Sequence, residues 1–189
     1  ANNKDPDLAR EGYWRVAELY MKSGNESKAI ESYKNYVWKY PAPYLLAQEA
    51  RLKLITLYDK RREQKKVVFW RQKIIEFYAK NKNQNNARTR FLAAESKFIL
   101  TQPLFESFKK IKLRLPLGKS LKKKKAAMNK ALKAYESVAD YQVAQYTSAS
   151  THKIGQIYQI LAKDLMDSQR PKGLNEEELE EYSFLLEDQ

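Results

Sequence analysis

Residues 13–41 have the sequence YWRVAELYMKSGNESKAIESYKNYVWKYP and contain one complete helical hairpin pattern. Apolar residues recur at intervals of three and four, which is typical of amphipathic helices and not of alternating strands. Gly24 separates the two halves and Pro41 ends the stretch. Because glycine favours tight turns and proline stops helices, the stretch predicts a helix–turn–helix unit.

The same pattern returns after a constant shift of 38 residues. Tyr20 maps onto Tyr58, and Tyr33 is the one mismatch, since it falls on Arg71 with Trp70 adjacent. The other matches send Ala29, Ile30, Tyr36, Val37 and Tyr40 to Val67, Val68, Ile74, Ile75 and Tyr78, in that order. A fixed period of this kind is the sequence signature of a helical repeat architecture.

Turn and helix-stop residues divide the rest of the chain into further helices. They lie at 23–25, 40–43, 81–86, 102–103, 116–118 and 170–173. With only five Gly and six Pro among 189 residues, and no alternating apolar pattern, the chain is expected to be all-α. Gly155 falls inside a helix expected from about 143 to 166, where glycine costs about 1 kcal/mol against alanine, so close helix packing is expected there.

The residue order of the first unit resembles a tetratricopeptide repeat (TPR). That order is Tyr13-x2-Val16-Ala17-x2-Tyr20, Gly24, Ala29-x3-Tyr33-x2-Tyr36 and Pro41. Two later stretches are similar, Ala131-x3-Tyr135-x2-Val138 and Ile154-Gly155-x2-Tyr158. The resemblance implies an α-solenoid, a right-handed superhelix of antiparallel helix hairpins in a single domain. Its expected units are about 10–43, 47–81, 84–140 with a basic insertion at about 104–121, and 143–189.

In the TPR family the first helix of each unit lines a concave groove that binds a peptide or helix of a partner. The resemblance implies groove residues beside the core stripe, namely Trp14, Glu18, Met21, Lys22, Leu52, Thr56, Asp59 and Lys60. Such a mixture suits peptide recognition, because aromatic anchors supply binding energy and charges set the register. For Leu52, a plain core position is the alternative. The expected function is a non-catalytic scaffold for protein partners.

The long period and the Tyr40-Pro-Ala-Pro-Tyr44 linker look more like bacterial cell-envelope TPR proteins. Examples are the lipoprotein subunit of the outer-membrane β-barrel assembly machine and periplasmic repeat proteins linked to gliding motility. The resemblance implies an envelope or periplasmic location, although the absence of Cys leaves the cytoplasm equally open. Residues 1–4 lack a signal-peptide pattern, and residues 182–189 stop inside an amphipathic pattern, so we expect a piece of a longer chain. No apolar run approaches the roughly 18–20 residues of a membrane span.

The formal net charge is +13, and the charge is unevenly distributed. The segment 109–125 contains nine basic residues and no acid, whereas 176–188 contains seven acids and no base. The basic residues are Lys109, Lys110, Lys112, Arg114, Lys119, Lys122, Lys123, Lys124 and Lys125. They form either a solvated face answered by the C-terminal acids, a surface for phosphates of nucleic acid or anionic lipid, or a site for an acidic protein. The segment has no aromatic residue to stack on bases, which disfavours nucleic acid.

No residue pattern indicates catalysis, and we expect no enzyme, metal site, cofactor or small-molecule substrate. Gly118-Lys119-Ser120 matches the end of a phosphate-binding loop, but the glycine required five residues earlier is Leu113. His152 is the only histidine, and no carboxylate pair has shielded surroundings. Four consecutive lysines, 122–125, are expected to begin a helix, where the helix dipole opposes them.

Overall fold

The computed structural model describes residues 5–173 and 175–187, and every regular element in them is helical, which confirms the all-α prediction. The α-helices are α1 (Pro6–Lys22), α2 (Glu26–Lys39), α3 (Tyr44–Lys60), α4 (Gln64–Lys80), α5 (Ala87–Lys110), α6 (Leu117–Ala139), α7 (Ala144–Met166) and α8 (Glu176–Glu187). A short 3-10 helix, η1 (Lys82–Gln84), precedes α5. Residues 1–4, 174, 188 and 189, which entered the expectations about chain ends and the last repeat unit, lie outside the described part.

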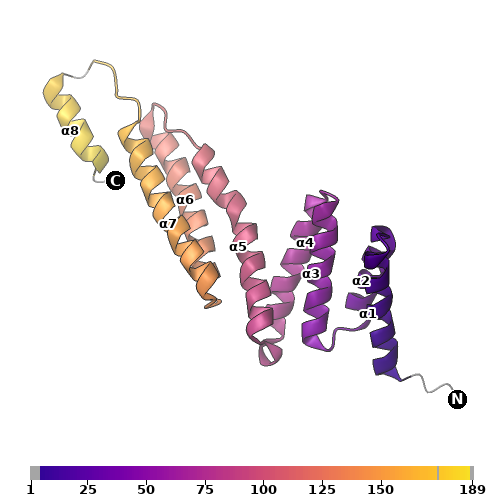
Figure 1. Cartoon of the computed structure of the whole chain (residues 1–189). Helices are drawn as coiled ribbons and strands as arrows, with labels where there is room; N and C mark the ends of the chain where they lie inside the picture. Colours follow the sequence, from indigo (N-terminus) through magenta and orange to yellow (C-terminus); the bar gives the residue numbers. More distant parts are fainter. Residues whose placement is uncertain (1–4, 174, 188–189) are drawn as a thin grey trace. The chain divides into compact units, whose positions relative to one another are not determined.

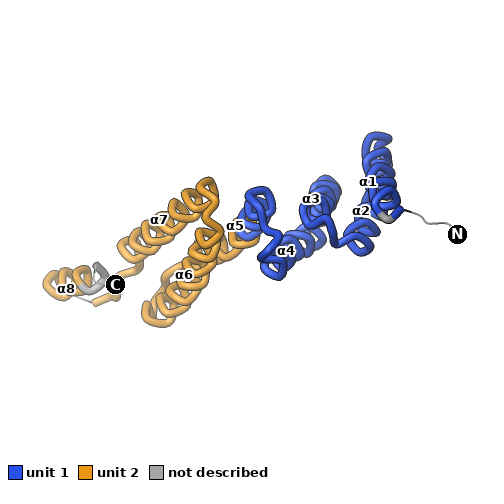
Figure 2. Tube along the Cα trace, turned by 90° about the horizontal axis from the view of Figure 1, so that it is seen from below, with its two compact units in different colours: residues 1–97 blue, residues 98–189 orange. Residues whose placement is uncertain are grey.

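The chain forms two compact units that divide between residues 97 and 98, within α5 (Figure 2). In unit 1, α1 packs on α2 and α3 packs on α4, each pair antiparallel, and α2 also contacts α3 (Figure 1). Figure 2 places α1 and α3 on one side of unit 1 and α2 and α4 on the other. In unit 2, α6 packs antiparallel to α7, and α8 contacts α7.

The turns of the two hairpins in unit 1 have the same hydrogen bonds, 38 residues apart. In the first turn, Asn25 N–H donates to Tyr20 O at 2.9 Å and Gly24 N–H donates to Met21 O at 3.1 Å. In the second, Glu63 N–H donates to Tyr58 O at 2.9 Å and Arg62 N–H donates to Asp59 O at 2.8 Å. Gly24 has φ +74° and Arg62 has φ +57°, as this C-terminal helix cap requires. The predicted period is therefore confirmed at the turn.

The buried residues of α2 and α4 follow the predicted repeat, except that the second large aromatic lies one position earlier. Tyr33 and Tyr36 of α2 are fully buried, and so is Ile74 at the position that matches Tyr36. Trp70 is buried beside the mismatched Arg71, and it supplies the large aromatic that Tyr33 supplies in the first hairpin. Val68 departs most from the pattern, because it is exposed although its partner in the repeat, Ile30, is buried. Ile75 is half-buried, whereas its partner Val37 is buried.

Three local predictions in the middle of the chain are wrong. Pro103 does not break a helix, because α5 continues through it to Lys110. A proline inside a helix costs about 3 kcal/mol or more, and the burial of Phe105 and Phe108 beyond it offsets that cost. The helix α6 begins at Leu117, so the four lysines lie in its second and third turns rather than at its start. Gly155 is exposed and no neighbour would touch an added Cβ, so no close packing explains it.

The core of unit 2 gathers side chains from α5, α6 and α7 and from the loop at 111–116. Its buried members are Phe105, Phe108, Leu113, Ala131, Leu132, Tyr135, Ile157, Leu161 and Leu165. Tyr135 is fully buried, and the ring of Phe105 meets it edge-on at 6.4 Å. The Ala131–Tyr135–Val138 stripe therefore buries the same positions of α6 as the Ala29–Tyr33–Tyr36 stripe does in α2.

Candidate functional site

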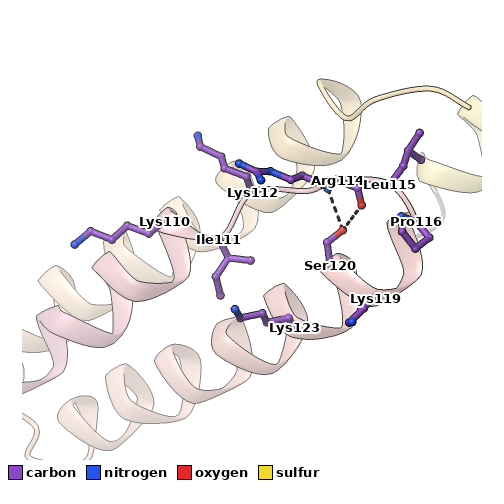
Figure 3. A pocket seen from close by; sticks show the side chains of 9 residues that line it. All are labelled: Lys110, Ile111, Lys112, Arg114, Leu115, Pro116, Lys119, Ser120 and Lys123. Atoms are coloured by element: carbon purple, nitrogen blue, oxygen red, sulfur yellow. Dashed lines mark hydrogen bonds between the residues drawn. The ribbon is translucent and has the colours of Figure 1, made fainter.

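The loop 111–116, between α5 and α6, borders a basic hollow of about 570 Å³ (Figure 3). Five cationic side chains line it, Lys110, Lys112, Arg114, Lys119 and Lys123, together with Ile111, Leu115, Pro116 and Ser120. No ion pair within the described chain neutralises any of these five cations. We call this site the basic hollow.

Ser120 fixes the loop of the basic hollow by binding both the N–H and the carbonyl of Arg114. Arg114 N–H donates to Ser120 Oγ at 3.0 Å, and Ser120 Oγ donates to Arg114 O at 2.7 Å. Figure 3 draws both bonds, which tie the first turn of α6 to the loop. The hydroxyl of Ser120 is therefore engaged with this chain's own backbone, and the Gly118-Lys119-Ser120 match does not form a phosphate-binding loop after a strand.

Lys124 does not belong to the anion-binding set in which it was predicted, because its side chain is fully buried. Its Nζ forms an ion pair with Asp164 of α7 and donates to Ile111 O at 2.8 Å. The ammonium group also lies 4.6 Å from the centre of the Phe108 ring. A lysine that meets the last carbonyls of a helix satisfies groups the helix leaves unpaired. Lys124 therefore fixes the end of α5 and the start of the loop.

The remaining predicted cations do not all reach the basic hollow. Lys109 is exposed and pairs with Glu106 at 3.5 Å, and Lys122 and Lys125 do not line the hollow. Successive residues of a helix point about 100° apart, so four consecutive lysines cannot share one face. The apolar lining residues Ile111, Leu115 and Pro116 were not predicted, although Ile111 and Leu115 alternate with Lys112 and Arg114 in the sequence.

The predicted groove residues occupy equivalent faces of α1 and α3, since each residue of the first set lies 38 positions before one of the second. Trp14, Glu18, Met21 and Leu52 are half-buried, and Lys22, Thr56, Asp59 and Lys60 are exposed. Trp14 meets the ring of Tyr33 at 5.7 Å and the ring of Tyr36 at 5.2 Å, both edge-on. One part of Trp14 therefore belongs to the core and the rest is accessible.

Some of these groove residues already have partners within the chain. Lys60 pairs with Glu26 at 2.5 Å, and Arg61 reaches the same carboxylate at 3.3 Å. Hydrogen bonds from these two bases hold the pKa of Glu26 below its usual range. Asp59 accepts a hydrogen bond from Gln64 at 3.0 Å, and Thr56 donates to Leu52 O at 3.1 Å. Lys60 and Asp59 are thus engaged near the helix ends and are weaker candidates for binding.

A second hollow, of about 410 Å³, lies at the N-terminal end of α1 and includes Trp14. We call it the Trp14 hollow, and its lining residues are Asp5, Asp7, Leu8, Arg10, Glu11, Trp14, Tyr36 and Leu46. Trp14 is the single predicted groove residue among them. Leu8 and Leu46 are 38 residues apart, so extending the repeat by two helical turns toward the N-terminus would have found both.

A buried tyrosine in each unit has a raised pKa. Burial raises the pKa of Tyr33 to about 12, and the nearby carboxylate of Glu18 acts in the same direction. Burial likewise raises the pKa of Tyr135 to about 12, with a contribution from Glu106. The hydroxyl groups of both tyrosines have no hydrogen-bond partner within the described chain. These hydroxyls are enclosed in the core, so their shifts concern stability and not chemistry on a substrate.

Comparisons with protein-family models, curated proteins and solved structures gave no match. None of the helices described here is both long and apolar enough to cross a membrane. The described residues also contain no cluster of three or more His, Asp or Glu side chains that could hold a metal ion.

Proposed function

We propose that this protein is a non-catalytic scaffold with TPR-like repeats that binds a segment of a protein partner on the α1–α3 side of unit 1. The repeated turn geometry and the placement of α1 and α3 on one side support this proposal. By the sequence resemblance, we further propose that it works in a bacterial cell envelope.

The Trp14 hollow is the observation that carries the proposal. It combines a half-buried indole, the apolar side chains of Leu8 and Leu46, and charges of both signs within about 410 Å³. Binding energy at protein interfaces concentrates on aromatic anchors in pockets, and surrounding charges set partner and register. Leu8 is 69% exposed, so the rim of the hollow offers apolar area that a partner would cover.

The test is capture of protein partners from native lysate by the purified chain and by a Leu8→Glu variant, at low and at high salt. Leu8 lies in the first turn of α1, where a carboxylate is favourable to the helix, so this variant should fold normally. We expect the wild-type chain to retain a defined protein at high salt and the variant to lose it. Because the contact is mainly apolar, added salt should weaken it little.

The matched control is Trp38→Ala, beside the more disruptive Trp14→Ala. Trp38 lies on α2 and is 67% exposed, so its removal tests whether any exposed tryptophan supports capture. We expect capture to survive in Trp38→Ala and to fail in Trp14→Ala and Leu8→Glu. Equal capture by wild type and Leu8→Glu would contradict the proposed site, and capture of no protein at either salt would contradict the scaffold function.

A further inference from the structure

The basic hollow holds an unusual amount of unneutralised charge at one place. Five cations from the end of α5, the loop and α6 line about 570 Å³, and no carboxylate pairs with them in the described parts of the chain. Like charges so arranged repel one another, and a polyanion would relieve that repulsion. The first turn of α6 adds the positive end of a helix dipole, since no side chain caps it.

The loop presents apolar side chains among these cations. Leu115 is 42% exposed at the tip, beside exposed Pro116, and Arg114 and Lys119 flank them. An exposed leucine between cations suits the boundary of a lipid bilayer, where apolar side chains enter the acyl region and cations meet headgroup phosphates. Figure 3 shows Leu115 beside Pro116, where the loop joins α6.

The internal contacts of the loop hold this arrangement in place. Ser120 fixes Arg114 through two hydrogen bonds, and buried Lys124 fixes Ile111 at the start of the loop. Preorganised groups lose less conformational entropy when a ligand binds, so this fixed loop binds a ligand at a lower entropic cost than a mobile loop would.

Nucleic acid fits the basic hollow less well than a lipid surface does. Binding of single strands uses aromatic rings on which bases stack, and no aromatic residue lines the hollow. The two rings in the last turns of α5 are covered by cations of this chain, because Lys124 lies over Phe108, and Lys109 and Lys153 lie over Phe105. Headgroup phosphates need only cations and backbone donors.

We propose that the basic hollow docks this protein on an anionic membrane surface, with the five cations binding headgroup phosphates and Leu115 entering the interface. The docking is peripheral and reversible. It is independent of the Trp14 hollow, which serves the proposed partner-binding function.

The experiment is co-sedimentation of the full chain with vesicles of phosphatidylcholine alone and of phosphatidylcholine with about 20 mol% phosphatidylserine. We expect binding to the anionic vesicles only, with a large loss between about 0.1 M and about 0.5 M salt. The double variant Arg114→Glu/Lys119→Glu should lower the partition coefficient at least about tenfold, since each cation near the surface contributes about fivefold. Leu115→Ser should lower it about fivefold without changing the charge.

The matched control is Lys130→Glu/Lys133→Glu, which changes the net charge equally on exposed positions of α6. These positions lie about 16 Å or more along the helix from Lys119, beyond the screening length of about 8–10 Å, so we expect less than a threefold effect. An equal loss in this control, or full binding by Leu115→Ser, would overturn the proposed site. Binding to a single-stranded RNA that depends on Arg114 and Lys119, without binding to vesicles, would assign the hollow to nucleic acid and overturn the proposal.

Discussion

Helices α2 and α6 bury the same stripe but differ in what precedes it. Tyr33 of α2 and Tyr135 of α6 are both fully buried, and each meets an aromatic ring of an earlier helix edge-on, Trp14 and Phe105 respectively. Before its stripe, α2 begins with the cap Asn25, whose side chain accepts a hydrogen bond from Lys28 N–H at 3.2 Å. In contrast, α6 has three additional turns that carry most of the lysines.

In both helices the shared stripe stabilises the fold, whereas the additional turns of α6 contribute residues to the basic hollow. The shared stripe holds each helix on its neighbours, and it needs only a small residue and a large aromatic at fixed spacing. The additional turns of α6 contribute two of the five cations around the basic hollow, Lys119 and Lys123, and bury a third lysine, Lys124. A repeated core therefore supports a basic site in unit 2 and an aromatic site in unit 1.

The largest expected effect tests whether the two stripes are equivalent. Tyr33→Ala and Tyr135→Ala should each lower the free energy of unfolding by about 3–5 kcal/mol, because each removes a fully buried ring. Circular dichroism at increasing urea measures the loss. All three tryptophans, Trp14, Trp38 and Trp70, lie in unit 1, so their fluorescence reports that unit separately. A loss below 1 kcal/mol in either variant would show that its stripe is not a core.

The next effect concerns Lys124, a buried lysine of α6. Lys124→Met should lower the free energy of unfolding by about 2–4 kcal/mol, because Asp164 loses its partner and the Ile111 carbonyl loses a donor. The control is Lys22→Met, at an exposed position of α1, which should change stability by less than about 0.5 kcal/mol. Lys124→Met/Asp164→Leu should recover part of the loss, and equal effects at 124 and 22 would contradict the structural role of Lys124.

A smaller effect compares the turns of the two units. Arg62 and Gln142 have φ +57° and +53°, a region that glycine adopts without strain. We expect Arg62→Gly and Gln142→Gly to stabilise the protein by about 0.5–1 kcal/mol each, and Gly24→Ala to destabilise it by about 1 kcal/mol. Thermal unfolding checks the sign of each change. If Arg62→Gly destabilises the protein, the turn is held by the arginine side chain and not by backbone conformation.

The smallest effect at neutral pH is that of removing the two buried hydroxyls. Tyr33→Phe and Tyr135→Phe should be nearly neutral at pH 7, because neither hydroxyl has a partner within the described chain. With folded pKa values of about 12, above the ordinary value of 10.0, both tyrosines keep their proton when folded. The stability that the raised pKa values give the folded state is complete below pH 10, and it is lost as the pH rises toward 12. The double variant should therefore lose less stability than wild type above pH 10, and identical pH profiles would contradict these pKa shifts.

The sequence predicted the all-α class, the 38-residue period and most helix boundaries, because periodicity and turn residues are local signals. It did not predict that α5 passes through Pro103, since the burial of Phe105 and Phe108 that offsets the proline is a tertiary effect. Burial of Lys124 was hidden for the same reason, because its partner Asp164 lies 40 residues away. Of the residues that line the Trp14 hollow, the sequence predicted Trp14 as a binding residue but not Leu8 and Leu46.

The most direct test of two separate surfaces is one capture experiment with two variants, Leu8→Glu and Arg114→Glu/Lys119→Glu. Each variant is mixed in turn with native lysate at high salt and with phosphatidylserine-containing vesicles at low salt. We expect Leu8→Glu to lose the protein partner and to keep binding the vesicles, and we expect the double variant to do the reverse. Loss of both ligands in either variant, from a chain that circular dichroism shows to be folded, would contradict it.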